Sequence, residues 1–228
     1  MPAGRTCPGK TELCHRLCYA RSGRFRFRDV KVAHESSLKR SHESGFVSWM
    51  VLTIRDVCAL AVRVHTGGDF YNARYVRQWI SIAKRCPNTC FYAYTRSWRD
   101  PRVAPALRQL AALPNFALWY SCDRETGEPP RNPGVERAWM AENDKDLPPF
   151  PVDLVFRNNI ERPRRTLGGY PICAYDQNVA QTSRVTCSHC QRCWKGNVLY
   201  QAKPEAQAED HGEATLRSLR GRRLVGAT

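Results

Sequence analysis

Two trios of cysteines in this chain have the spacing of metal or cluster ligands. The N-terminal trio consists of Cys7, Cys14 and Cys18, and the C-terminal trio consists of Cys187, Cys190 and Cys193. Thiolates a few residues apart can converge on one soft ion, and the C-x2-C-x2-C spacing of the C-terminal trio begins the common bacterial iron–sulfur motif. Zinc sites more often use paired C-x2-C units, so the pattern favours an iron–sulfur cluster, with zinc as the alternative.

A disulfide framework would also account for a high cysteine count, and the chain has 11 cysteines among 228 residues. However, residues 1–10 contain no apolar segment of the kind that directs secretion, and an odd number of cysteines leaves one thiol unpaired. Both features favour a reducing compartment, where clustered thiols serve as metal ligands or catalytic groups. We therefore expect a cytoplasmic protein.

The composition indicates a globular protein with a strong positive charge. A hydrophobic content of 42% suits one main core, and no apolar run approaches the roughly 18 residues that would span a bilayer, so no membrane partner is expected. The formal net charge is +15, and arginine alternates with phenylalanine over residues 24–28. This alternation suits contact with nucleic acid, although a strand with Phe25 and Phe27 in the core would show the same pattern.

Strands and helices are expected to alternate through the middle of the chain. Apolar runs predict strands at residues 61–66, 89–94 and 115–120. Capping residues predict one helix after Asn72, ending near residue 85, and a second from Asp100 and Pro101 to about residue 113. This β-α-β-α-β order requires a parallel sheet, open or closed into a barrel, with ligand sites at the carboxyl ends of its strands.

The alternation breaks at residues 122–151, where pairs of proline and glycine punctuate a polar stretch. We expect an irregular insertion there, of the kind that forms lids, with one short helical patch at residues 135–142. A further strand is expected at residues 152–156. The sequence thus predicts a single domain over residues 1–200, followed by a flexible basic tail at residues 201–228.

Two glycine-containing motifs could bind a ligand. Residues 4–11 match the phosphate-loop pattern G-x4-G-K-[ST], but that loop must follow a buried strand and only three residues precede Gly4, so a P-loop NTPase is excluded. The second motif consists of Gly67, Gly68 and Asp69, directly after an expected strand. Paired glycines let a backbone approach a ligand and an acid can hold an ammonium, whereas a tight turn with Asp69 as a helix cap would use the same residues.

Four segments together resemble the gene product 88-like family of phages and plasmids. They are residues 6–20, 64–70, 91–97 and 187–194, and the resemblance extends from about residue 6 to residue 196. That family is in turn distantly similar to the radical S-adenosylmethionine (radical SAM) enzymes. The resemblance implies an α/β fold with a partial (β/α) barrel of radical-SAM-like type and cysteine-rich loops at both ends. The composition of the residues from about 203 onward adds a disordered C-terminal tail.

The resemblance also implies roles for individual residues. The N-terminal trio would hold a [4Fe-4S] cluster with one iron open to S-adenosylmethionine, and Gly67, Gly68 and Asp69 would lie along the methionyl part of that cofactor. A second site, similar to auxiliary clusters, would consist of Cys173, Cys187, Cys190 and Cys193; alternatively, all these cysteines divide differently over one or two clusters. The chain departs from the radical SAM pattern in its C-x6-C-x3-C spacing and in Asp69, where glutamate is commoner.

Three functions remain open on the sequence. The first is a radical-SAM-like enzyme of a mobile element; the second is an iron–sulfur or zinc protein that binds nucleic acid without catalysis; the third is a redox partner that receives electrons from a donor. The basic N-terminal region and tail favour the second, and the position of the glycine motif at a strand end favours the first. The enzyme is our leading hypothesis, although the sequence identifies no catalytic residue.

Overall fold

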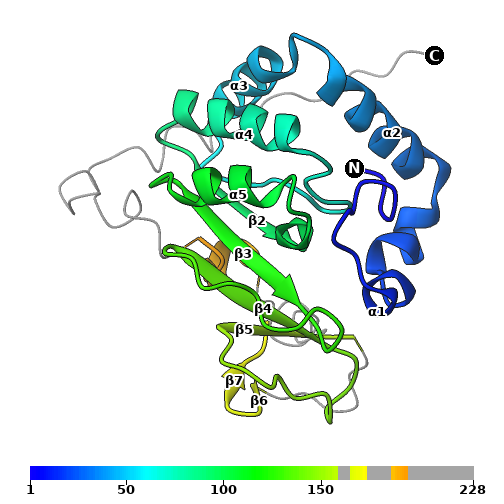
Figure 1. Ribbon diagram of the computed structural model, residues 1–228. Helices are drawn as coiled ribbons and strands as arrows, with labels where there is room; N and C mark the ends of the chain where they lie inside the picture. The colour runs from blue at the N-terminus through cyan, green and yellow to red at the C-terminus, as the bar shows by residue number, and fades with distance from the viewer. Residues whose placement is uncertain (159–164, 174–185, 195–228) are drawn as a thin grey trace, which may run out of the picture.

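The computed structural model describes residues 1–158, 165–173 and 186–194. Within these ranges, five parallel strands form one sheet in the order β1-β2-β3-β4-β5, which curls into a half-barrel (Figure 1). The strands are β1 (Ala61–Arg63), β2 (Cys90–Thr95), β3 (Phe116–Cys122), β4 (Val135–Ala141) and β5 (Leu154–Arg157). A separate antiparallel pair consists of β6 (Thr166–Leu167) and β7 (Tyr170–Pro171). The chain is therefore a mixed α/β protein with a parallel sheet, as the sequence predicts.

Helices cover one face of this sheet (Figure 1). They are α3 (Phe46–Asp56), α4 (Ala73–Arg85) and α5 (Ala104–Ala111), and α2 (Arg28–His42) leads into α3. The main core lies between these helices and the sheet, where Trp79 of α4 packs against Phe91 of β2 and Phe91 stacks on Phe116 of β3. Because strand side chains alternate, Tyr94 and Trp119 lie on the other face, inside the curl of the sheet.

Most of the expected elements are confirmed. The four expected strands correspond to β1, β2, β3 and β5, and Asn72 caps α4 by accepting a hydrogen bond from the backbone nitrogen of Tyr75 at 2.8 Å. The expected start of the next helix is wrong, because α5 begins at Ala104. The Asp100 carboxylate instead accepts from the backbone nitrogen of Arg102 at 2.9 Å and closes a turn before the helix.

The expected helical patch at residues 135–142 is also wrong, because Val135–Ala141 forms strand β4 between β3 and β5. Both faces of β4 are covered: Trp139 packs with Val155 on one side, and Ala138 packs with Trp119 on the other. A strand covered on both faces lacks the alternation that would reveal it in the sequence. The stretch from 122 to 151 therefore contributes one strand to the sheet, and residues 123–134 and 142–151 on either side of that strand are irregular.

The arginine–phenylalanine alternation at residues 24–28 does not form a strand. These residues lie in a 3₁₀ turn, Gly23–Arg26, and at the start of α2, and Phe27 is 63% exposed. The expected tail at residues 201–228 lies outside the described residues. Among the helices of the described ranges, none has the length and apolar character needed to cross a membrane.

Candidate functional site

The N-terminal cysteines lie at the carboxyl ends of the parallel strands. Residues 7–18, which we call the cysteine loop, include the short helix α1 (Glu12–Arg16) and pass close to the end of β3 (Figure 1). A cavity of about 120 Å³, which we call the cysteine cavity, opens between this loop and the strand ends. Its lining includes all six residues that the sequence nominates at this end, namely Cys7, Cys14, Cys18, Gly67, Gly68 and Asp69. The fold therefore brings two separate sequence motifs to one place.

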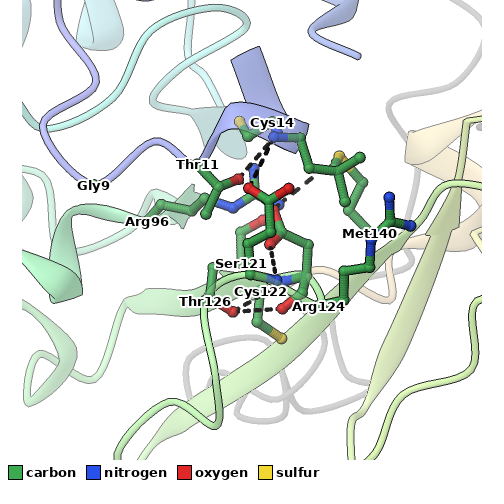
Figure 2. A network of polar contacts seen from close by, with 12 residues as sticks. Gly9, Thr11, Cys14, Arg96, Ser121, Cys122, Arg124, Thr126 and Met140 are labelled. Atoms are coloured by element: carbon green, nitrogen blue, oxygen red, sulfur yellow. Dashed lines mark hydrogen bonds and ion pairs between the residues drawn. The ribbon is translucent and has the colours of Figure 1, made fainter. Parts of the chain in front are cut away.

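A buried polar network holds the cysteine loop against the sheet (Figure 2). Thr11 caps α1 by accepting from the backbone nitrogen of Cys14 at 3.0 Å, and its hydroxyl donates to Oδ2 of Asp123 at 2.7 Å. Asp123 is fully buried after β3 and forms an ion pair with Arg96, which follows β2, at 3.0 Å. The position of Cys14 thus depends on residues at the ends of two strands.

The approach of the loop to the sheet requires a glycine. A Cβ atom at Gly9 would lie 1.8 Å from the carbonyl oxygen of Arg96, so no other residue fits there without moving the backbone. The backbone oxygen of Gly9 also accepts from Arg99 at 3.0 Å. This glycine lets the loop between Cys7 and Cys14 approach the backbone directly after β2.

The glycine motif connects the end of β1 with the end of β2. The buried carboxylate of Asp69 accepts from the hydroxyl of Thr95 at 2.6 Å and from the backbone nitrogen of Arg96 at 2.8 Å. Burial raises the pKa of Asp69, while these hydrogen bonds favour its charged form. Asn72, rather than Asp69, caps the following helix, so the interpretation of Asp69 as a helix cap is wrong.

Gly68 has a structural requirement of its own. Its φ of +74° lies in the left-handed region, and a Cβ atom there would lie 2.3 Å from the hydroxyl oxygen of Thr6. The motif therefore holds the N-terminal segment in place, and it also lines the cysteine cavity.

Two thiols of the cysteine cavity, those of Cys7 and Cys14, lie in an environment that disfavours thiolates in the absence of a cation. Burial raises the pKa of Cys7 to about 12, and the charges of Asp69, Cys14 and Cys18 act in the same direction. Burial also raises the pKa of Cys14, against the opposing effect of Arg96. A bound metal group would have to displace these protons, so metal binding and proton release are coupled here.

The lining of the cysteine cavity includes three thiols that could serve as ligands of a metal group. Among the residues that the structure describes, no three His, Cys, Asp or Glu side chains are grouped so that they could hold one metal ion. A [4Fe-4S] cluster has a different requirement, because each thiolate binds a different iron and the ligands surround a volume. Three cysteines that line one cavity fit that requirement, and thiolates are the ligands such clusters use.

The C-terminal cysteines lie inside the curl of the sheet. The hydroxyl of Tyr94 donates to Sγ of Cys193 at 2.8 Å, the indole of Trp119 donates to the carbonyl oxygen of Cys193 at 3.0 Å, and Trp194 packs on Tyr92. Burial raises the pKa of Cys193, and the nearby Cys187 and Cys190 of helix α7 (Cys187–Cys190) add to the rise. The structure thus brings the C-terminal trio together.

The fourth proposed member of this second site, Cys173, packs with Trp119, Leu154 and Phe156 on the same inner face. Residues 174–185, which connect it to the C-terminal trio, lie outside the described ranges. Cys173 and the C-terminal trio therefore lie on the same face of the sheet, the face inside the curl.

A second cavity, of about 190 Å³, adjoins the cysteine cavity, and we call it the arginine cavity. The two share five lining residues, namely Cys14, Cys18, Tyr19, Arg96 and Ser121. The arginine cavity is further lined by Leu17, Arg63, Tyr94, Met140, Phe156, Arg157 and Asn158. Arg96 and Asp123 were not predicted as site residues from the sequence. They directly follow β2 and β3, and their position near the ends of two expected strands was the available signal.

His65, which lies between β1 and the glycine motif, is buried against aromatic rings. Its ring meets Phe70 edge to face at 4.6 Å, and its Nε2 lies 3.3 Å from the hydroxyl of Tyr75. Burial lowers the pKa of His65 to about 3, and the charges of the N-terminus and Arg63 act in the same direction. The imidazole is therefore neutral in the folded protein near pH 7.

We expect this histidine to make folding stability depend on pH between about 6.5 and 3. An unfolded histidine has a pKa of about 6.5, so in this range the unfolded state takes up a proton that the folded state excludes, and stability falls as the pH falls. The slope for one such group approaches about 1.4 kcal/mol per pH unit. In urea unfolding from pH 7 to pH 4, His65→Gln should flatten the curve, whereas His42→Gln at an exposed site should not. Equal slopes for the two variants would contradict this assignment.

Comparison with known proteins finds similar proteins in mycobacteriophages. The family model described as "Gene product 88" matches residues 1–196. The chain is similar to "Gene 88 protein" of Mycobacterium phage L5, with 27% identity over 140 residues that cover 54% of this chain and 55% of the relative. "Gene 88 protein" of Mycobacterium phage D29 matches with 26% identity and the same coverage. The chain spans about half the length of these curated relatives, and no solved structure matches it.

Proposed function

The chain belongs to the gene product 88 family, and we propose that it is an iron–sulfur enzyme of radical-SAM-like type encoded by a phage or plasmid. In this proposal, Cys7, Cys14 and Cys18 hold a [4Fe-4S] cluster, and S-adenosylmethionine binds beside it. One observation carries the proposal: the three cysteines and the glycine motif line a single cavity at the carboxyl ends of parallel strands. Ligands of β/α folds bind at that edge of the sheet.

When bound, such a cluster supplies an electron and an open iron site to the cofactor. The described residues would orient the cofactor. Arg96 lines both cavities and its guanidinium is positively charged, so it can bind the carboxylate of the cofactor. Asp69 accepts a hydrogen bond from the backbone of Arg96 and so fixes the glycine turn relative to the end of β2. The turn would then lie along the methionyl part of S-adenosylmethionine.

In this proposal, the four cysteines on the inner face of the sheet, Cys173 and the C-terminal trio, form a second cluster site. Tyr94 lines the arginine cavity and donates to Cys193, so it lies between the cavity and the C-terminal trio. Cys173, Cys187, Cys190 and Cys193 are the proposed ligands. An external electron donor would be needed to reduce either cluster.

Titration with S-adenosylmethionine tests the enzyme proposal. In reconstituted and reduced protein, the cofactor should change the paramagnetic resonance spectrum of the cluster at the N-terminal trio. Asp69→Asn should weaken this response, because the turn and Arg96 lose the carboxylate that holds them together, and Cys58→Ala at an exposed site should leave it unchanged. An unchanged spectrum in the parent protein, with the cluster present, would leave only the redox and structural functions.

The second candidate is a metal-stabilised protein that binds nucleic acid without catalysis. The observation that favours it is the surface of residues 24–28, where Arg24, Arg26 and Phe27 are exposed. Arginines beside an exposed ring suit contact with phosphates and bases. If this function holds, duplex DNA should bind with a strong salt dependence, and Arg24→Gln with Arg26→Gln should reduce the slope of log affinity against log salt by about 0.9 per lost phosphate contact.

A further inference from the structure

The arginine cavity has an unusual set of charges. Three guanidinium groups line it, those of Arg63, Arg96 and Arg157, and no aspartate or glutamate stands among its described lining residues. Arg96 pairs with Asp123, and Arg157, whose side chain is fully buried, pairs with Asp144. Two of the three positive charges are therefore balanced by carboxylates behind the wall of the cavity.

Arg63 differs from the other two. Its Nε donates to the carbonyl oxygen of His65 at 2.8 Å, and one of its terminal nitrogens donates to the hydroxyl of Tyr19 at 3.2 Å. Both partners are neutral, and in the described part of the chain no carboxylate lies within ion-pair distance of Arg63. The cavity therefore carries one positive charge that its own wall does not balance.

The remaining walls of the cavity are aromatic and apolar. The rings of Tyr94 and Phe156 meet at a right angle with centroids 5.1 Å apart, and Met140 and Leu17 complete the apolar surface. The guanidinium carbon of Arg63 lies 5.8 Å from the centroid of the Tyr94 ring. A cavity of about 150 Å³ lined by apolar side chains can bind benzene, so the 190 Å³ here leaves room for one ring and a small substituent.

We propose that the arginine cavity binds a small planar anion, a single aromatic or pyrimidine-like ring that carries a carboxylate or phosphate. The anionic group would contact Arg63, and the ring would lie against Tyr94 and Phe156. A free amino acid fits less well, because its ammonium would face three guanidinium groups. Cys14 and Cys18 line both cavities, so the ligand would lie beside the N-terminal trio. Only the further step, that this ligand is the substrate of the enzyme, rests on the proposed function.

Calorimetric titration with matched probes tests the binding. Benzoate and benzamide have nearly the same shape and differ in charge, and orotate and orotamide provide the corresponding pair for a pyrimidine. In anaerobically prepared full-length protein, each anion should bind at least about tenfold more tightly than its neutral partner, which is about 1.4 kcal/mol. The stronger of the two anions identifies whether the ring is carbocyclic or pyrimidine-like. Equal affinities within both pairs would overturn the proposal.

Variants test which residues provide the preference. Arg63→Gln should remove most of the preference for the anion, Arg63→Lys should retain part of it, and Arg55→Gln on the exposed surface of α3 should leave it unchanged. Phe156→Leu should weaken charged and neutral probes alike. An unchanged preference in Arg63→Gln would overturn the assignment. Iron content is measured in the same samples, so a protein that prefers the anions but contains no cluster would refute the proposed function and leave this binding site standing.

Discussion

Replacing Asp123 by asparagine is expected to lower the free energy of unfolding by about 3 to 5 kcal/mol. The carboxylate is fully buried and pairs with Arg96, whose side chain is only 9% exposed, so the substitution would leave a buried positive charge without a counterion. It would also weaken the contact with Thr11, which holds the cysteine loop. Denaturant unfolding with a linear extrapolation measures the change.

The matched control is Arg102→Gln. Arg102 pairs with Asp100 at 2.8 Å, but its side chain is 85% exposed, and solvent screening leaves exposed pairs with little effect on stability. Asp123→Asn should therefore destabilise the protein several times more than the control does. Similar changes in the two variants would show that the network around Asp123 does not hold the ends of β2 and β3 to the cysteine loop.

The second large effect concerns the division of iron between the two cysteine groups. Cys14→Ala should remove about four irons per chain, because a [4Fe-4S] site needs its full set of thiolates, and should abolish the response to S-adenosylmethionine. Cys187→Ala should lower the iron content as well but preserve that response, since Cys187 does not line the cysteine cavity. Iron analysis combined with paramagnetic resonance measures both. If either variant loses all its iron while remaining folded, one shared cluster replaces the two-site proposal.

Much of the sheet could be predicted because its signals are local. The apolar run at β2 and the Asn72 cap of α4 are readable within a few residues, and they fix the parallel arrangement once strands and helices alternate. Strand β4 could not be recognised in this way. It contains Glu136, Arg137 and Met140, and the buried Arg137 is tolerated only because Glu128 and the carbonyl oxygen of Pro129 accept its hydrogen bonds, which no local pattern reveals.

In the candidate site, too, the residues that belong to local sequence motifs could be predicted, and those brought together from distant parts of the chain could not. Cysteine spacing and the glycine motif nominate the residues of the cysteine cavity, because each motif is contiguous in sequence. The arginine cavity could not be anticipated, since Arg63, Tyr94 and Arg157 come from β1, β2 and β5 and meet only when the sheet curls. The hydrogen bond from Tyr94 to Cys193 could not be predicted from residue spacing either, because the two residues are 99 positions apart in the sequence.

The metal content of anaerobically purified full-length protein tests the central claim most directly. The claim that Cys7, Cys14 and Cys18 surround a [4Fe-4S] cluster predicts a brown protein with broad absorption from sulfide-to-iron charge transfer. It also predicts iron and acid-labile sulfide in equal amounts, about four of each per site. Stoichiometric zinc without sulfide would contradict the claim and identify the cysteines as ligands of a structural metal.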